Sequence, residues 1–142
     1  MKAKQTIAFE YSTVARQTTT STAPNFGLTE IIIPTAEPTA NDAVLSMLAY
    51  LSQHAGDRWL TWITTTPVHK SQISDFNFAL NKIRLVHISH TDKSLSVLKS
   101  ALEDGSSASV VASLDYLNEK SRKTLENASI IGSCKGLIIR RP

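Results

Sequence analysis

Apolar and polar residues alternate in blocks along this chain, so that short apolar runs are separated by longer amphipathic segments. The short runs are rich in Ile, Val, Leu and Trp, which are residues that favour β-strands. Between the second and third runs, Pro67 opens a less regular segment with room for one or two helical turns. The predicted strands cover residues 29–34, 58–64, 84–89, 109–114 and 136–140.

The longer segments repeat apolar residues at the i, i+3, i+4, i+7 spacing of a helix with one buried face. Asn41 or Asp42 is placed to cap the first helix, Asp92 the second, and Asp115 or Asn118 the third. Strands that alternate with such helices predict an α/β domain with a parallel sheet and right-handed crossovers. The predicted inward positions are Val44, Met47, Leu48, Leu51, Leu95, Leu98, Ala101, Leu102, Leu117, Ser121, Leu125 and Ala128.

Residues 1–27 differ in composition from the rest of the chain. The stretch 17–22 reads Gln-Thr-Thr-Thr-Ser-Thr and offers almost nothing to bury, so we predict a flexible N-terminal arm. The short apolar patch at residues 7–9 within this arm could dock on the body or on a partner. The ordered α/β domain is expected over residues 28–142, and a chain of 142 residues fits one domain.

The glycines of this chain stand apart from one another, which argues against a glycine-rich loop that could hold a phosphate. The loop at residues 34–38 has two prolines, which lack an N–H donor, and a carboxylate that repels phosphate. We therefore expect a nucleotide-hydrolase scaffold without a nucleotide site, and no cofactor. The five glycines are Gly27, Gly56, Gly105, Gly132 and Gly136.

Charge, cysteine content and hydropathy limit the partners and the compartment that we expect for this protein. The formal charge is +3 and the isoelectric point is near 9.1, but the Lys and Arg residues are scattered, so a nucleic-acid partner is not favoured. Cys134 is the only cysteine, so no internal disulfide can form, which suits a reducing cytoplasm. No apolar run approaches the roughly 20 residues needed to span a bilayer, so we expect no membrane association.

A small cationic patch is expected where two neighbouring strands begin. Arg58 starts the second predicted strand and Arg84 the third, with Lys82, Trp59 and Ile63 nearby in the sequence. Arginine beside aromatic and apolar anchors is typical of a protein–protein interface, here for an acidic loop. The alternative is that each arginine only marks a solvated strand start, and it is the more common situation for an arginine.

The opposite edge of such a sheet, where the strands end, normally binds small ligands. Ser89, His90 and Asp115 could be imagined there as a catalytic set, but no strained, glycine-flanked nucleophile turn accompanies them, so we predict no catalytic residues. His87 and His90 do not have a metal-ligand spacing, and no metal site is predicted. His87 is expected to be a hydrogen-bonded core residue.

The segment 58–64, Arg-Trp-Leu-Thr-Trp-Ile-Thr, follows a leucine-rich helix and a Gly-Asp turn, and it resembles the SulA family of cell-division inhibitors. The resemblance continues through residues 83–89, the helix 94–104 and the end 136–142, so that it covers roughly residues 28–142. It implies a RecA-like, three-layer α/β domain with a mostly parallel five-stranded sheet that has lost its P-loop. It also implies a non-enzymatic inhibitor, made in the SOS response to DNA damage, that forms homodimers.

The same resemblance implies a partner and the residues that bind it. Members of the family bind the tubulin-like division GTPase FtsZ, cover its polymerisation surface and stop septum formation. The matching positions are Arg58, Ile63 and Arg84, and Lys70 lies in a segment that matches the family less closely. Arg58 and Arg84 would pair with the acidic loop of FtsZ, whereas Ile63 would either support that surface or pack beneath it. The alternatives are a RecA-like recombination or mutagenesis accessory protein that contacts DNA or DNA-bound proteins, and a degenerate ATPase.

Overall fold

The computed structural model describes residues 26–33, 38–90 and 93–140, and the side chains of residues 38–40 are not described. Most of the predicted arm at residues 1–27, the greater part of the loop at 34–38, and the proposed cap Asp92 lie outside the described residues. Gly27, the last residue assigned to the arm, is the first residue of a strand.

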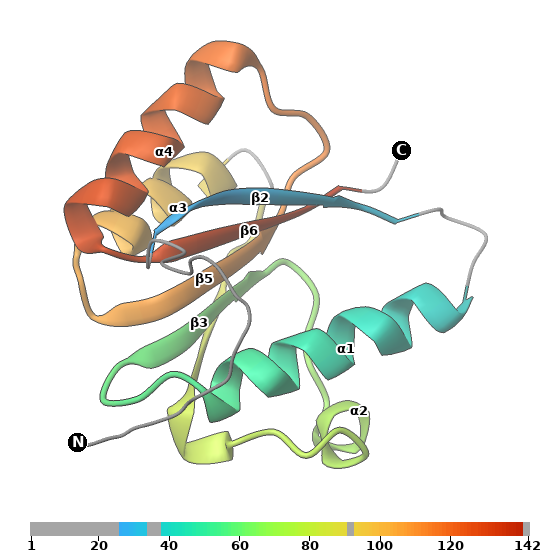
Figure 1. The fold of residues 1–142 in the computed structure, drawn as a ribbon. Coiled ribbons are helices and arrows are strands. Elements are labelled where there is room, and N and C mark those ends of the chain that lie inside the picture. Colours follow the sequence, from blue (N-terminus) through green and yellow to red (C-terminus); the bar gives the residue numbers. More distant parts are fainter. Residues whose placement is uncertain (1–25, 34–37, 91–92, 141–142) are drawn as a thin grey trace, which may run out of the picture.

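All of the described strands belong to one parallel sheet, in the order β2-β6-β5-β3-β4 (Figure 1). The predicted parallel α/β architecture is therefore confirmed. The predicted strands are present, with boundaries shifted by one or two residues. The five strands are β2 (Gly27–Ile32), β3 (Trp59–Thr64), β4 (Ile83–His87), β5 (Ser107–Ser113) and β6 (Lys135–Arg140).

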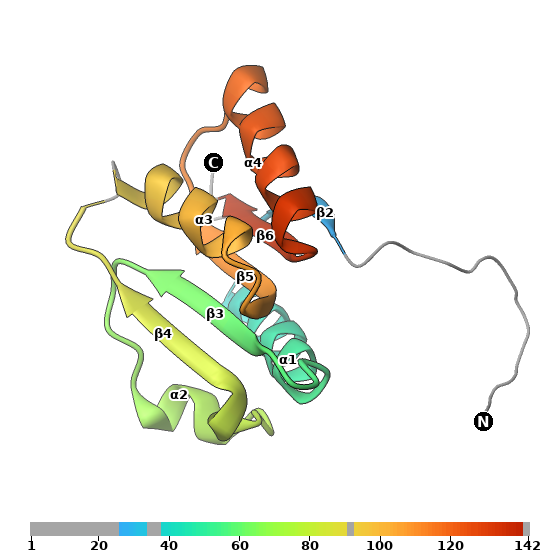
Figure 2. The same ribbon diagram turned by 90° about the vertical axis from the view of Figure 1, so that its left-hand side faces the viewer.

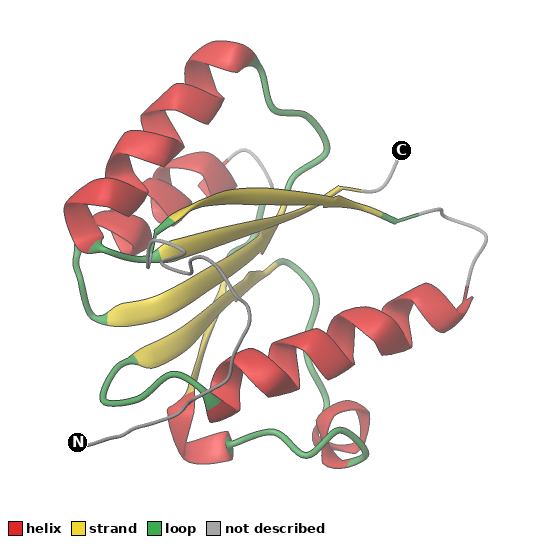
Figure 3. Ribbon diagram, in the orientation of Figure 1, coloured by secondary structure: helices red, strands yellow, loops and turns green. Residues whose placement is uncertain are grey.

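Helices cover both faces of the sheet, with α3 and α4 on one face and α1 with the short α2 on the other (Figures 2 and 3). The segment after Pro67 forms only α2 and one 3₁₀ turn, as its irregular pattern predicts. The helical elements are α1 (Pro38–Gln53), α2 (Lys70–Ser74), η1 (Leu80–Lys82), α3 (Ser94–Glu103) and α4 (Glu119–Gly132).

A separate apolar cluster fills each side of the sheet. The side chains of β5 alternate between the two clusters, because Val110 and Ala112 pack beneath α3 and α4 whereas Val111 packs against α1. Leu48 of α1 and Leu98 of α3 are fully buried in these clusters. Burying one such leucine stabilises the fold by about 1.5–3 kcal/mol before entropic costs, so the two clusters hold the helices to the sheet.

Helix starts confirm one of the predicted caps and correct another. Asn118 caps α4, because its side-chain oxygen accepts a hydrogen bond from the Ser121 amide at 2.7 Å. Asn41 and Asp42 do not cap α1, which already begins at Pro38. Proline suits the first helical position because its φ angle is fixed near the helical value and its missing N–H would have no partner there.

Two burial predictions were wrong for identifiable reasons. Leu95 shares the inward face of α3 with Leu98, yet it is 37% exposed, because helical spacing fixes the direction of a side chain but not what covers it. His87 was expected in the core, but it is exposed because β4 is an outer strand. The ring of His87 does form a hydrogen bond, since Nε2 lies 3.1 Å from the carbonyl oxygen of Thr65.

Strand β2 forms the other edge of the sheet, and ion pairs hold it to its neighbours. Glu30 accepts a hydrogen bond from Arg140 at 3.1 Å and also pairs with Arg122 of α4. The Glu30 side chain is only 17% exposed, so this carboxylate is largely enclosed by its two partners. Within the described ranges, no helix has both the length and the apolar character needed to cross a bilayer.

Candidate partner-binding edge

The two arginines predicted to share an edge are brought together by the pairing of β3 with β4. Arg84 lies in register with Thr61, and Arg58 directly precedes the first residue of β3. Both guanidinium groups reach the turn between α3 and β5, where Arg58 contacts Gly105 and Arg84 contacts Ser106. We call the surface formed by Arg58, Trp59 and Arg84 the cationic edge.

Arg58 is tied to the ends of two helices. Its Nη1 donates to the carbonyl oxygens of Gly132 at 3.2 Å and Gly105 at 3.5 Å, and its Nη2 donates to that of Ser133 at 2.9 Å. These carbonyls follow or end α3 and α4, where backbone oxygens lack helical partners and the helix dipoles are negative. Arg58 therefore holds the ends of the two helices together, and backbone carbonyls accept hydrogen bonds from both of its terminal nitrogens.

Arg84 is held by hydroxyl groups. Its Nη2 donates to the hydroxyls of Ser106 at 2.6 Å, Ser107 at 3.0 Å and Thr61 at 3.1 Å, and its Nε lies 3.3 Å from the same Thr61 oxygen. The central carbon of the guanidinium lies 5.7 Å from the ring centre of Trp59, which suits a cation–π contact. Trp59 is 39% exposed, so this pair reaches the surface.

The direct hydrogen-bond partners of Arg84 are neutral, and the Asp104 carboxylate is linked to it only through the Ser106 hydroxyl. Hydroxyl groups and an indole ring are neutral, and no ion pair among the described residues includes Arg84 or Arg58. The Nη1 group of Arg84 has no hydrogen-bond partner in the described part of the chain. Its N–H donors can therefore bind an incoming carboxylate while the other side of the guanidinium stays fixed.

The supporting hydroxyls were not anticipated from the sequence. Thr61 and Ser107 are buried and their hydroxyl oxygens lie 2.6 Å apart, while Ser106 also donates to the Asp104 carboxylate at 2.8 Å. The sequence does contain one indication of them. Thr61 occupies an inward position of the apolar strand 58–64, and a buried hydroxyl needs a hydrogen-bond partner.

Cys134 lies beneath this edge and is chemically quiet. Burial is the main cause that raises the pKa of the Cys134 thiol to about 12, while the charge of Arg58 lowers it and that of Asp104 raises it. The thiol therefore stays protonated near neutral pH and is not a nucleophile. Cys134 is fully buried, so it packs as a small apolar side chain.

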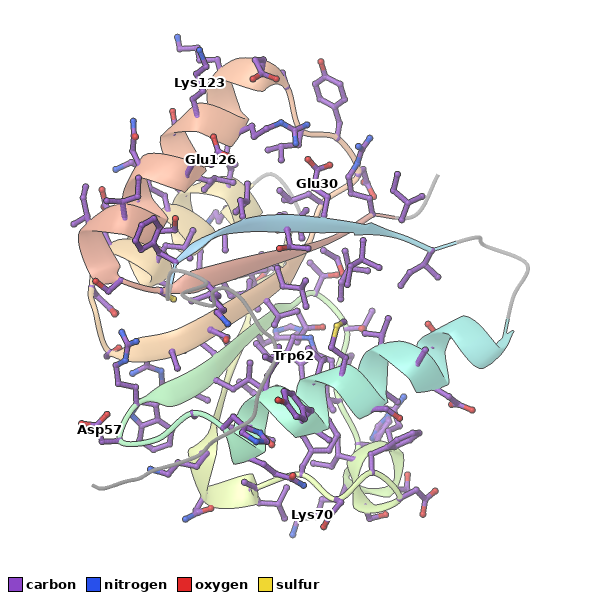
Figure 4. All side chains as sticks on the ribbon, in the orientation of Figure 1. Glu30, Asp57, Trp62, Lys70, Lys123 and Glu126 are labelled. Carbon is purple, nitrogen blue, oxygen red and sulfur yellow. The ribbon has the colours of Figure 1, made fainter. Side chains whose placement is uncertain are left out.

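The other two predicted contact residues do not join the cationic edge. Ile63 is 2% exposed and packs in the cluster beneath α3 and α4, so of its two expected roles only packing fits the structure. Lys70 is the exposed first residue of α2. Figure 4 shows Lys70 apart from Asp57, the neighbour of Arg58, and shows Trp62 between the sheet and α1.

The opposite edge, where the strands end, contains a cavity of about 450 Å³. Trp62 and residues of α1 form its apolar wall, and Thr64–Thr66, Ser94 and Asp115 contribute polar groups. Ser89 and His90 do not line it, so the described structure does not assemble the catalytic set considered above. No group of three or more His, Cys, Asp and Glu residues that could hold a metal ion occurs in the described ranges.

No family model matches the chain, and no curated protein matches it. Among solved structures, SulA from Pseudomonas aeruginosa matches with a TM-score of 0.74 and 25% sequence identity. The match covers 81% of this chain and 98% of the SulA chain, so it includes nearly the whole of that protein. This chain is therefore a structural relative of SulA, and the likeness supports its place in the SulA family.

Proposed function

We propose that this protein is a cell-division inhibitor that binds FtsZ and blocks its polymerisation without catalysis. The observation that carries the proposal is the SulA fold, which this chain shares over 98% of the SulA chain. The cationic edge supports it, because the charges of Arg58 and Arg84 are met by neutral groups rather than by carboxylates. A rigid, charged and partly aromatic surface is suited to docking on an acidic region of another protein.

The mechanism that we propose is capping of one polymerisation surface. A head-to-tail filament grows only while each subunit has both of its complementary faces free. A folded domain bound to one of those faces withdraws the subunit from the filament. Such an inhibitor needs affinity and rigidity only, and the Arg58 contacts that join α3 to α4 supply rigidity at the docking edge.

The two arginines have different parts in this proposal. Arg84 pairs with a carboxylate of the acidic loop of FtsZ through its free Nη1 group, and Trp59 provides an exposed apolar surface beside it. Arg58 acts mainly as a positioning residue, because helix-end carbonyls accept most of its hydrogen bonds. Ile63 packs in the core and makes no contact with FtsZ in this proposal, and Lys70 would contact FtsZ only if the interface extends to α2.

Further parts of the proposal follow from the SulA likeness. The protein would act in the cytoplasm as a homodimer during the SOS response, with a RecA-like domain that has lost its P-loop. Among the described residues that line the cavity at the strand ends, Asp115 contributes a carboxylate, which does not favour a bound phosphate.

Expression in a bacterial host whose FtsZ is the intended partner tests the function. The expected result is filamentous growth, together with reduced FtsZ sedimentation and GTPase activity when the purified proteins are mixed. Normal septation at high expression, with unchanged FtsZ assembly in vitro, would contradict the proposal. A gel shift with DNA at moderate salt separates this function from that of a recombination accessory protein.

A further inference from the structure

The cavity where the strands end lies at the switch point of the sheet topology. After β3 the chain continues to β4 on one side of that strand, whereas after β5 it continues to β6 on the other side, and β3 and β5 are neighbours. In open α/β sheets, small ligands bind in the crevice that such diverging connections leave. Thr64 and Thr65 at the end of β3, and Ser113 and Asp115 at the end of β5, line the cavity. Its volume of about 450 Å³ suits a small molecule.

A buried hydroxyl group without a partner lines this cavity. Ser94, the first residue of α3, is 2% exposed, and its side chain makes no hydrogen bond to another described residue. Within the described ranges, the one fully enclosed side-chain atom that lacks a partner is Nε of Arg140, so the Ser94 oxygen is not sealed and reaches the cavity. Burying a hydroxyl without a partner costs free energy, so a ligand that supplies a partner is favoured. The positive end of the α3 dipole favours an oxygen atom as that partner.

One wall of the cavity is flat and apolar. Trp62 of β3 forms it together with Val44 and Leu45 of α1. The ring of Trp62 is stacked on that of Phe78, with the ring centres 6.4 Å apart and an angle of 2° between the two planes. Trp62 is only partly buried, so part of its surface is available to a ligand. An indole ring held in this way packs well against another aromatic ring.

The lining of the cavity contains negative charge and no positive charge. Asp115 contributes a carboxylate, and no Lys, Arg or His is found among the described residues that line the cavity. The Asp115 carboxylate forms no ion pair or hydrogen bond with another residue that the structure describes. Asp115 is exposed, so it lies where the cavity opens to solvent. An ammonium group is therefore favoured at the open end, whereas an anion there would be repelled.

We propose that this cavity binds a small aromatic amine that carries an oxygen atom at the end away from its ammonium group. The ammonium group donates to Asp115 at the opening, the ring packs on Trp62, and the oxygen forms a hydrogen bond with the Ser94 hydroxyl at the buried end. This site goes beyond the proposed function and does not depend on it, because the cavity and the cationic edge lie where the strands end and begin, respectively.

Tyramine is a suitable probe, because its phenol and its ammonium group stand at opposite ends of one aromatic molecule. The amide resonances of Thr65 and Ser94 should shift saturably at millimolar tyramine in two-dimensional NMR spectra, while amides on the exposed face of α4 stay unchanged. Hydroxyphenylpropionate, which has a carboxylate in place of the ammonium group, should bind at least about fivefold more weakly. Phenethylamine, which lacks the phenol oxygen, should also bind about fivefold more weakly than tyramine.

Two variants test the polar contacts separately. Asp115→Asn should weaken the binding of tyramine and phenethylamine alike by about fivefold, without weakening that of hydroxyphenylpropionate. The matched control Asp57→Asn removes the same charge from an exposed residue beside Arg58, where the strands begin, and should leave all three affinities unchanged. Ser94→Ala should weaken tyramine binding about fivefold but leave phenethylamine binding unchanged. Its free protein should be at least as stable as the unmodified chain, because the hydroxyl has no partner to lose.

The contrary results are equally specific. The absence of shifts at Thr65 and Ser94 in millimolar tyramine would overturn the proposal. Equal or tighter binding of hydroxyphenylpropionate would identify an anion at the start of α3 as the occupant and would overturn it as well. Unchanged tyramine affinity of Ser94→Ala, or a loss of stability in that variant, would overturn the Ser94 contact. Each measurement uses this protein alone, so its outcome is independent of whether the protein binds FtsZ.

Discussion

Replacing Gly132 with alanine should strongly destabilise the protein, because α3 and α4 meet there without room for a side chain. A Cβ atom at Gly132 would overlap the carbonyl oxygen of Leu102 and lie 2.9 Å from the carbonyl carbon of that residue. The opposing atoms belong to backbone, so relief requires the two helices to move apart. Such a movement would also displace the Gly132 carbonyl that accepts from Arg58.

The expected loss can be bounded from known effects. Overpacking a tight interior costs about 1–3 kcal/mol and occasionally more, and a backbone obstacle belongs at the upper end of that range. The higher helix propensity of alanine offsets about 1 kcal/mol. We therefore expect the free energy of unfolding to fall by about 2 kcal/mol or more, a large part of the 5–15 kcal/mol that is typical of a domain.

Urea unfolding followed by circular dichroism measures this difference, with Gly56→Ala as the matched control. Gly56 has a φ angle of +66° and nothing lies within 4 Å of a Cβ atom built there. Alanine at this position is therefore destabilised only by the strain of a left-handed backbone conformation. That cost is about 1–2 kcal/mol. A Gly132→Ala protein that is as stable as the unmodified chain, or more stable than Gly56→Ala, would refute the close approach of α3 and α4.

Further predictions concern the same edge. Arg58→Met should lower the free energy of unfolding by about 1–3 kcal/mol, because the helix-end carbonyls of Gly105, Gly132 and Ser133 lose their donor, and urea unfolding will show it. Thr61→Val removes a hydroxyl that accepts a hydrogen bond from Arg84. FtsZ affinity should therefore fall several-fold, which is more than the loss of thermal stability explains, and calorimetry with both proteins can check this. Burial raises the pKa of the Cys134 thiol from 9.0 to about 12, so its contribution to stability is complete below about pH 9 and is lost as the pH rises toward 12. Unfolding at pH 8 and pH 10.5 should show a smaller pH dependence for Cys134→Ala than for the unmodified protein, and equal dependence would contradict this assignment.

Much of the fold follows from local patterns in the sequence. The alternation of apolar runs with helical spacing predicts parallel strands, because a parallel pair needs a long crossover between its members. Trp59 and Trp62 are three residues apart in one strand, and they do lie on opposite faces of the sheet, one beside Arg84 and the other beside Phe78. Arg58 and Arg84 share an edge because both lie where parallel strands begin, whereas their close approach depends on the pairing of β3 with β4, which the structure supplies.

Other features depend on tertiary contacts that no local pattern encodes. The exposure of His87 could not be predicted, because only the strand order β2-β6-β5-β3-β4 makes β4 an outer strand. Arg58 makes its contacts where the ends of α3 and α4 meet. Its partners Gly105 and Gly132 lie 47 and 74 residues after it in the chain. The cap of α1 was misplaced because Asn41 and Asp42 are good cap residues in isolation, whereas a proline three residues earlier begins the helix.

The central claim is that the cationic edge is the docking surface, and calorimetric titration of purified FtsZ with Arg84→Glu tests it most directly. The matched control is Lys123→Glu, which makes the same charge change at an exposed residue of α4, away from the edge (Figure 4). Reversing a charge that is paired at an interface costs about 2–5 kcal/mol, so we predict a loss of affinity of roughly 30-fold or more for Arg84→Glu and less than about twofold for Lys123→Glu. Equal binding by Arg84→Glu and the unmodified protein, with both folded, would contradict the claim.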